Sequence, residues 1–274
     1  MLVQRHESEQ GRWEMACRDA AAALRPHVRG YVGYVEDSPG PFRRLATPSD
    51  EVHVILSFGP RMRVPHPVTS FVAAPHSHAT VTEHDGRQHG LELRLTPLGA
   101  RMLLGVPMGE LADQVVELDA LLGRDAGELI ERVHDARTWA ARFALLDALL
   151  ARRLAEARQP PPEVEGAWWR LTRTRGATPV ADLVRESGWS RRHFTARFRG
   201  EVGLGPKVFA RVLRFDAAAR ELQRPGGRSL AEIALDCGYY DQAHLNRDFR
   251  AFAGVTPTQL LARRLPDGGG WTAG

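Results

Sequence analysis

A stretch near the C-terminal end, residues 229–257, constrains the fold most: SLAEIALDCGYYDQAHLNRDFRAFAGVTP. Gly238 ends a first short helix, because reversing the chain there requires a left-handed conformation. Asp241 then stands where the N-cap of a second helix belongs. The apolar residues recur at helical spacing, with Leu230, Ile233 and Ala234 in the first helix and Leu245, Phe249 and Phe252 in the second. Two short helices joined by a tight turn are typical of a helix-turn-helix.

The same stretch carries a family resemblance. The run from Ile233-Ala234 through Gly238-Tyr239 and Phe249-Arg250 to Gly254-Val255-Thr256-Pro257 resembles the second helix-turn-helix of the AraC/XylS family of transcription regulators. The resemblance implies an N-terminal cupin-like sensor domain and a C-terminal DNA-binding domain with two such motifs. It is more specific in the C-terminal half than in the N-terminal half. The alternative interpretation of the stretch is an ordinary amphipathic helical hairpin.

An earlier stretch, Pro179–Phe198, repeats the pattern, with Gly188 in the role of Gly238. From Gly205-Pro206 to about Gln223 the spacing predicts one long connecting helix. Eighteen residues of helix span about 27 Å at ~1.5 Å per residue. Successive major grooves on one face of DNA lie about 34 Å apart. With side-chain reach added, the helix has the length to place two reading helices in adjacent grooves, where the reading helix is the second helix of each copy.

The first turns of a reading helix meet base edges in the major groove. Arginine can contact guanine in a bidentate manner, asparagine or glutamine can contact adenine, and an alanine methyl can touch thymine. The base-reading candidates are Arg192, Thr195 and Ala196 in the first copy and Gln242, Ala243, Asn246 and Arg247 in the second. The phosphate candidates are Arg191, Arg197, Arg199, Arg211 and Arg250. We expect the richer base readout from the second copy; for any single arginine the alternative is a solvated charge.

The charge of the chain is unevenly divided. The 274 residues carry a net charge of +4. Residues 163–274 have a net charge of +6, and the residues before them have a net charge of −2. A basic C-terminal part suits a domain that faces phosphates. The chain has 2 cysteines, Cys17 and Cys237, which exclude a disulfide framework or a cysteine-rich zinc site. With no apolar run long enough for a membrane span and no secretory signal, we expect a reducing cytoplasm.

Short apolar segments separated by Pro and Gly turns fill the first hundred residues. Residues 1–20 are polar and expected to be loosely held, and residues 20–29 have helical spacing. Strands are predicted at 31–35, 51–58, 62–64, 70–73, 80–83 and 89–95. Many short strands with close turns indicate a small barrel or sandwich. The fold class is therefore α+β with two domains: an N-terminal cupin-like β-barrel with packed helices and an all-α C-terminal domain with two helix-turn-helix motifs joined by a long helix.

Helical spacing begins after Pro97, at 98–104, 108–116, 126–134 and 138–157. In the last of these, Trp139, Phe143, Leu146, Leu150 and Leu154 form an apolar stripe. The stripe can pair with its copy in a homodimer or pack on its own barrel. Gln159-Pro160-Pro161-Pro162 holds the backbone extended. The expected domains are 1–158 (sensor and dimerisation), 159–162 (linker), 163–265 (DNA binding) and 266–274 (a disordered tail).

A histidine cluster offers the one candidate for metal chemistry. His76 and His78 lie two apart, Glu83 follows and Gly90 comes later, which resembles the first metal motif of cupins. The second cupin motif, which would supply another histidine, is not visible downstream. The default interpretation is therefore solvent-exposed histidines, and no metal or other cofactor is expected.

These patterns predict a sequence-specific DNA-binding transcription regulator and not an enzyme. The expected partners are double-stranded DNA, a small effector in the N-terminal domain and, for an activator, RNA polymerase; no membrane is involved. A first alternative is a cupin-type metalloenzyme fused to DNA-binding helices, which only the histidine cluster supports. A second is a ligand-independent regulator whose N-terminal domain is purely structural.

Overall fold

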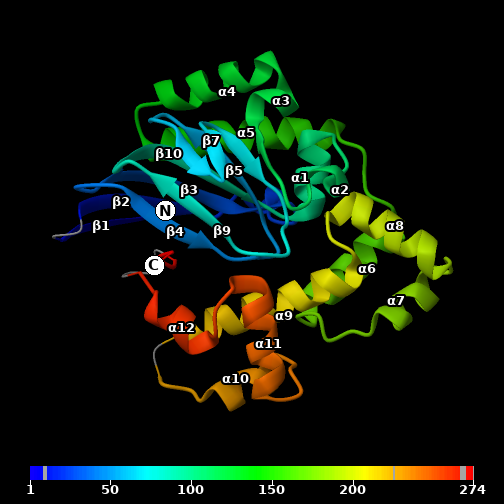
Figure 1. The fold of residues 1–274 in the computed structure, drawn as a ribbon. Helices are drawn as coiled ribbons and strands as arrows, with labels where there is room; N and C mark the ends of the chain where they lie inside the picture. The colour runs from blue at the N-terminus through cyan, green and yellow to red at the C-terminus, as the bar shows by residue number, and fades with distance from the viewer. Residues whose placement is uncertain (9–10, 225, 266–269, 274) are drawn as a thin grey trace.

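The computed structural model describes residues 1–8, 11–224, 226–265 and 270–273. Antiparallel sheets and five α-helices make up the first 156 residues, and α-helices make up the rest (Figure 1). The predicted α+β class, with a sheet-rich N-terminal part and a helical C-terminal part, is confirmed. Within the described ranges, no helix combines the length and the apolar character needed to cross a bilayer.

The N-terminal part contains two antiparallel sheets. Their strands are β1 (Leu2–Ser8), β2 (Gly11–Arg18), β3 (Val28–Asp37), β4 (Phe42–Ala46), β5 (Val52–Ser57), β6 (Met62–Val64), β7 (His66–Val68), β8 (Phe71–Ala73), β9 (Thr80–His84), β10 (Arg87–Leu95) and β11 (Val115–Glu117). The seven-stranded sheet has the order β1-β2-β3-β10-β5-β8-β11, and the four-stranded sheet has the order β4-β9-β6-β7. The central strand β10 alternates, so that Leu91, Leu93 and Leu95 enter the helix-covered core while Glu92 and Arg94 lie on the other face.

The face opposite the helices carries charged pairs. Arg44 of the four-stranded sheet donates two hydrogen bonds of 2.8 Å to Glu36 of the seven-stranded sheet, and His84 lies 3.3 Å from the same carboxylate. Burial alone would raise the pKa of Glu36, but the hydrogen bonds from His84 and Arg44 lower it to about 2. The carboxylate is therefore ionised at neutral pH and joins the two sheets.

Two sequence expectations for the first thirty residues are wrong. Residues 1–20, expected to be loose, contain the hairpin of β1 and β2, which pairs with β3 and extends the large sheet. Residues 20–29, expected to be helical, contain only a 3-10 turn at Ala22–Leu24 before β3 begins. Pairing along a sheet edge satisfies backbone groups without needing apolar alternation, so polar residues such as Arg5 and Glu14 are accommodated as a cross-strand ion pair of 2.7 Å.

Five helices follow the strands of the N-terminal part: α1 (Pro97–Leu104), α2 (Met108–Leu111), α3 (Leu118–Leu122), α4 (Arg124–Asp135) and α5 (Trp139–Glu156). Helix α2 is shorter than the predicted 108–116, because residues 115–117 pair with β8 instead. In α5, Phe143, Leu146 and Leu150 are buried in the core of the chain's own sheet. The apolar stripe thus packs on its own domain, and these side chains are not available for a homodimer.

The C-terminal part consists of α6 (Pro162–Arg173), α7 (Val180–Ser187), α8 (Arg191–Val202), α9 (Pro206–Gln223), α10 (Leu230–Asp236), α11 (Gln242–Ala253) and α12 (Pro257–Ala262). Pro162, expected in the linker, is the first residue of α6, where a missing N–H costs nothing. The non-helical connection between α5 and α6 therefore covers residues 157–161.

The two parts touch through several contacts, which include ion pairs and a backbone hydrogen bond. Arg101 of α1 lies 3.3 Å from Glu201 of α8, and the N–H of Leu45 in β4 donates to the carbonyl oxygen of Trp271 at 2.9 Å. Arg220 of α9 lies 3.6 Å from Asp50. The tail prediction of disorder is wrong for the described residues 270–273, because Thr272 forms an antiparallel bridge with Arg44. The rest of the predicted tail, 266–269 and 274, lies outside the described residues.

Asp216 makes the contact between Arg220 and Asp50 sensitive to pH, because Arg220 also pairs with Asp216. Burial raises its pKa to about 7; Arg220 opposes the shift, while Asp50 and Glu51 add to it. A carboxyl whose pKa is raised on folding contributes stability at low pH and loses it as pH rises through the folded value. We expect Asp216→Asn to stabilise the chain by about 2 kcal/mol at pH 8 and by less at pH 5. Urea unfolding at both pH values measures this, and an equal gain at both would contradict it.

Candidate nucleic-acid interface

The second copy, α10 with α11, is held by local hydrogen bonds at both ends of its turn. Ser229 and Glu232 form a capping box at the start of α10. Gly238 has φ +79°, which lets the N–H of Tyr239 donate to the carbonyl of Ala234 at 2.9 Å and close the helix. Asp241 caps α11 by accepting a 2.7 Å hydrogen bond from the N–H of His244. The turn that the sequence predicts is therefore built as expected.

The first copy, α7 with α8, has the same construction. Helix α7 ends at Gly188 with φ +68°, and the Ser190 side chain accepts a hydrogen bond from the N–H of His193 at the start of α8. Phe194 and Phe198 are fully buried on the inner face of α8. The outer face is left to polar residues.

Helix α9 is the common support of both copies (Figure 1). Its 18 residues confirm the predicted connecting helix of Gly205-Pro206 to about Gln223. Near its N-terminus Phe209 lies 5.9 Å from Phe198 of α8, between ring centroids. Further along, Phe215 lies 4.8 Å from Phe249 and 5.3 Å from Phe252 of α11. Both reading helices are thus fixed to one rigid element about 27 Å long.

Most of the predicted DNA-contacting residues lie on the outer faces of the reading helices. The exposed ones are Arg191, Arg192, Ala196, Arg197, Arg199, Gln242, Ala243, Arg247 and Arg250. Thr195 and Asn246 are half-buried, and the Oδ1 atom of Asn246 is covered without a hydrogen-bond partner in the part of the chain that the structure describes.

Arg211 differs from the other predicted phosphate contacts. Its guanidinium donates a 2.7 Å hydrogen bond to Asp248, whose side chain is only 4% exposed. It also lies 4.9 Å from the ring centroid of Phe252. We therefore assign Arg211 to joining α9 with α11.

Arginines with unpaired side chains lie on the outer faces of the reading helices. On the reading helices, the side chains of Arg192, Arg199 and Arg247 make no hydrogen bond or ion pair with any residue that the structure describes. By contrast, several arginines elsewhere in this part are engaged by carboxylates: Arg170, Arg185, Arg211, Arg220, Arg224 and Arg228. Cations that are exposed and uncompensated are the ones available to phosphates and base edges.

An N-terminal element lies beside the first reading helix, which sequence reasoning did not anticipate. Pro107, Gly109 and Glu110 of the α2 region face Arg192, Thr195 and Arg199 across an open groove of about 820 Å³. A Cβ on Gly109 would meet the backbone oxygen of Arg199 at 3.0 Å, so glycine permits this close approach. Nothing in the local sequence marks a glycine as a contact to a helix ninety residues away.

The structure does not bring the candidate metal ligands together. His76 hydrogen-bonds the carbonyl of Ala74 at 2.8 Å, His78 lies 3.4 Å from Asp113, and Glu83 lies 3.4 Å from Arg43. Burial lowers the pKa of His76, which keeps its imidazole neutral. Three or more His, Cys, Asp or Glu side chains in a metal-binding arrangement are not found among the described residues.

Comparison with known proteins agrees with this geometry. A family model described as a helix-turn-helix domain matches residues 183–263. An HTH-type transcriptional regulator of Mycobacterium tuberculosis is 32% identical over 102 residues, which are 37% of this chain and 39% of that protein. A putative AraC-like transcription regulator of Streptomyces lividans is 38% identical over 78 residues, 28% of this chain and 25% of that protein. The matches thus span well under half the length of these relatives.

The chain is also similar to solved structures. The DNA-binding domain of AdpA, crystallised with a target DNA, has 30% identity and a TM-score of 0.33, covering 37% of this chain and 90% of that one. ToxT of Vibrio cholerae has 10% identity and a TM-score of 0.43, covering 81% of this chain and 96% of that one.

The C-terminal part is therefore a helix-turn-helix domain. More narrowly, it is similar to two Streptomyces proteins that are named putative AraC-like transcription regulators.

Proposed function

We propose that the chain is a sequence-specific DNA-binding transcription regulator whose N-terminal part binds a small effector. The observation that carries the proposal is the pair of reading helices fixed to α9, with outer arginines that no described carboxylate neutralises. One polypeptide would then place α8 and α11 in two successive major grooves. The proposed domains are the sheet-rich part, which ends with α5, and the helical part, which begins at Pro162, with the non-helical residues 157–161 between them.

The contact of α2 with α8 suggests how an effector would act. In this conformation the α2 region lies beside Arg192 and Arg199, on the side of α8 from which DNA would approach. A ligand that binds one arrangement of the two parts more tightly than the other shifts the equilibrium by its differential affinity. The regulator would therefore bind DNA with different affinity when the effector is present. Equal operator affinity for ligand-saturated and ligand-free protein at fixed salt would refute this coupling.

The alternative of a ligand-independent regulator predicts a different result in a thermal-shift experiment. A purely structural N-terminal part gives no thermal shift with any small molecule, whereas an effector raises the unfolding temperature by mass action. The metalloenzyme alternative rested on the histidine cluster, which the structure does not assemble. Selection of bound genomic fragments by the full chain tests the central proposal, because a regulator enriches a discrete sequence with two half-sites about one helical turn apart.

Arg247→Ala gives a sharper test of sequence reading. Arg247 is exposed on the outer face of α11 and has no described partner. We expect the change to cost about 1–3 kcal/mol of operator binding and to relax the preference at one base pair. Arg173→Ala removes an exposed charge from α6 and serves as the control. A loss that is uniform over all sequences would instead make Arg247 a phosphate contact.

A further inference from the structure

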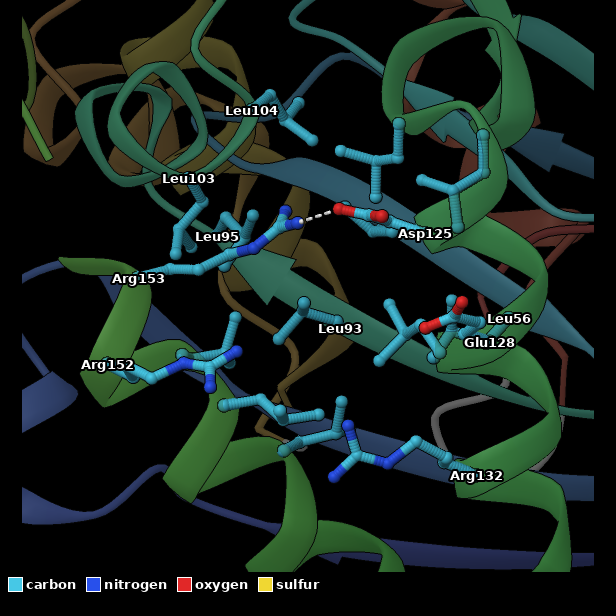
Figure 2. Close-up of a pocket in the computed structure, with 17 residues that line it drawn as sticks. Leu56, Leu93, Leu95, Leu103, Leu104, Asp125, Glu128, Arg132, Arg152 and Arg153 are labelled. Carbon is cyan, nitrogen blue, oxygen red and sulfur yellow. Dashed lines mark hydrogen bonds and ion pairs between the residues drawn. The ribbon is translucent and has the colours of Figure 1, made fainter. Parts of the chain in front are cut away.

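A cavity of about 230 Å³ lies between the helix-covered face of the large sheet and helices α4 and α5 (Figure 2). Its walls are leucines and one valine from β5, β10, α1, α3, α4 and α5. Leu93 and Leu95 form the floor on the sheet, and Leu129 and Leu149 come from the two covering helices. An apolar cavity with few polar groups at its opening is the usual form of a small-molecule site.

Charged residues surround the opening of the cavity, and positive charges outnumber negative ones. Arg153 and Asp125 pair with each other at 3.1 Å. The side chains of Arg132 in α4 and Arg152 in α5 make no ion pair or hydrogen bond with any residue that the structure describes. Figure 2 shows both side chains reaching over the apolar floor from opposite helices. Glu128 is the one other acidic residue of the lining, so the unpaired groups have an excess of one positive charge.

We propose that this cavity binds a small amphipathic monocarboxylate, with its hydrocarbon part among the leucines and its carboxylate between Arg132 and Arg152. Hydrocarbon transferred from water into the leucine-lined space is stabilised by burial. An arginine holds a carboxylate through charge-assisted hydrogen bonds, often two at once. The volume lies just below the roughly 300–1,000 Å³ of sites for drug-sized ligands, which suits a compact or short-chain acid.

Helix α1 connects this cavity with the DNA-binding part. Leu103 and Leu104 of α1 form part of the cavity wall. One turn earlier, Arg101 pairs with Glu201 of the first reading helix at 3.3 Å, with the two side chains 20% and 14% exposed. Leu98, at the start of α1, is buried in the same core as the C-terminal helices. A ligand that changes the packing of one side of α1 therefore changes the surface that contacts α8. An effect on DNA binding follows only if the proposed function holds.

The binding test uses the full chain and three probes of equal chain length: octanoate, octan-1-ol and octylamine. Isothermal titration calorimetry measures each affinity without DNA. We expect octanoate to bind about tenfold or more tightly than octan-1-ol and octylamine to bind most weakly, because only the carboxylate meets the two arginines. Arg132→Gln and Arg152→Gln are each expected to weaken octanoate about tenfold and to leave octan-1-ol unchanged. Arg61→Gln, an exposed arginine outside the cavity, is the matched control and changes neither.

Leu149→Trp fills the cavity from α5 and is expected to abolish octanoate binding while cooperative urea unfolding is retained. Octan-1-ol binding as tightly as octanoate, or arginine variants that bind octanoate like the parent, would overturn the proposal. A third result would also overturn it: the parent protein binds no octanoate but forms a dimer, and Leu149→Trp disrupts that dimer. The cavity would then be covered by a second copy of the chain.

The DNA arm is separate from the binding arm. Operator affinity is measured with and without saturating octanoate in the parent and in Arg101→Gln, which breaks the contact of α1 with α8. The octanoate effect on DNA affinity is expected to fall in Arg101→Gln while octanoate still binds. If the chain binds octanoate but no DNA sequence, the cavity assignment is supported and the proposed function is refuted. If it binds DNA but no octanoate, the proposed function is supported and the cavity assignment is refuted.

Discussion

Replacing Arg211 by alanine is expected to destabilise the chain by about 3–5 kcal/mol. The change leaves the Asp248 carboxylate without its 2.7 Å partner in a position where the side chain is 4% exposed. An unpaired charge that is buried costs far more than the ion pair itself contributes. The loss also removes the guanidinium from the ring of Phe252, 4.9 Å away. Urea unfolding followed by circular dichroism measures the free energy of unfolding.

Two further variants separate structure from DNA contact. Asp248→Ala should cost less than Arg211→Ala, because the half-exposed guanidinium can turn to water. In the double variant the two losses should not add, since both remove the same pair. A phosphate contact predicts a different result: Arg211→Ala would retain the parent's stability and lower the salt dependence of DNA binding by about one ion.

The second large effect is expected for Phe215→Ala, at about 3–5 kcal/mol. Phe215 is fully buried on α9 and packs at a tilt against Phe249 and Phe252, so its removal opens a cavity where α9 supports the second reading helix. The N-terminal sheet has a core cluster of its own. Hydrogen exchange should therefore show lost protection in α9 to α11 while β3 and β10 stay protected.

Phe215→Leu is the matched control, because an apolar replacement of similar volume is expected to cost less than about 1.5 kcal/mol. If Phe215→Ala unfolded the large sheet together with the helices, the two cores would form one cooperative unit. That outcome would place most of the chain's stability at the contact between the two parts.

The reading helices could be predicted from sequence because their information is local. A glycine with positive φ, an N-cap side chain and apolar residues at helical spacing all lie within thirty residues of one another, as at Gly238, Asp241 and Phe249. Each specifies its own turn or face without help from distant segments. The predicted range of the connecting helix, from Gly205-Pro206 to about Gln223, and the predicted N-cap Asp241 therefore agree with the structure.

The features that were missed depend on distant partners. The hairpin of β1 and β2 exists because β3 offers an edge, and the sequence of residues 1–20 does not contain that edge. Similarly, Arg211 has the exposed-charge pattern of a phosphate contact until Asp248, 37 residues later, is placed against it. The cavity beneath α4 and α5 required six separate elements to be positioned, so no local pattern indicated it.

The bridge of Thr272 with Arg44 gives the C-terminal helices a further attachment to the sheet-rich part, in addition to the chain crossing at 157–161. Within one molecule, the tail meets β4 at an effective concentration in the millimolar range that short tethers produce. A free peptide with the sequence of residues 270–273, at micromolar concentration, would therefore compete poorly for β4.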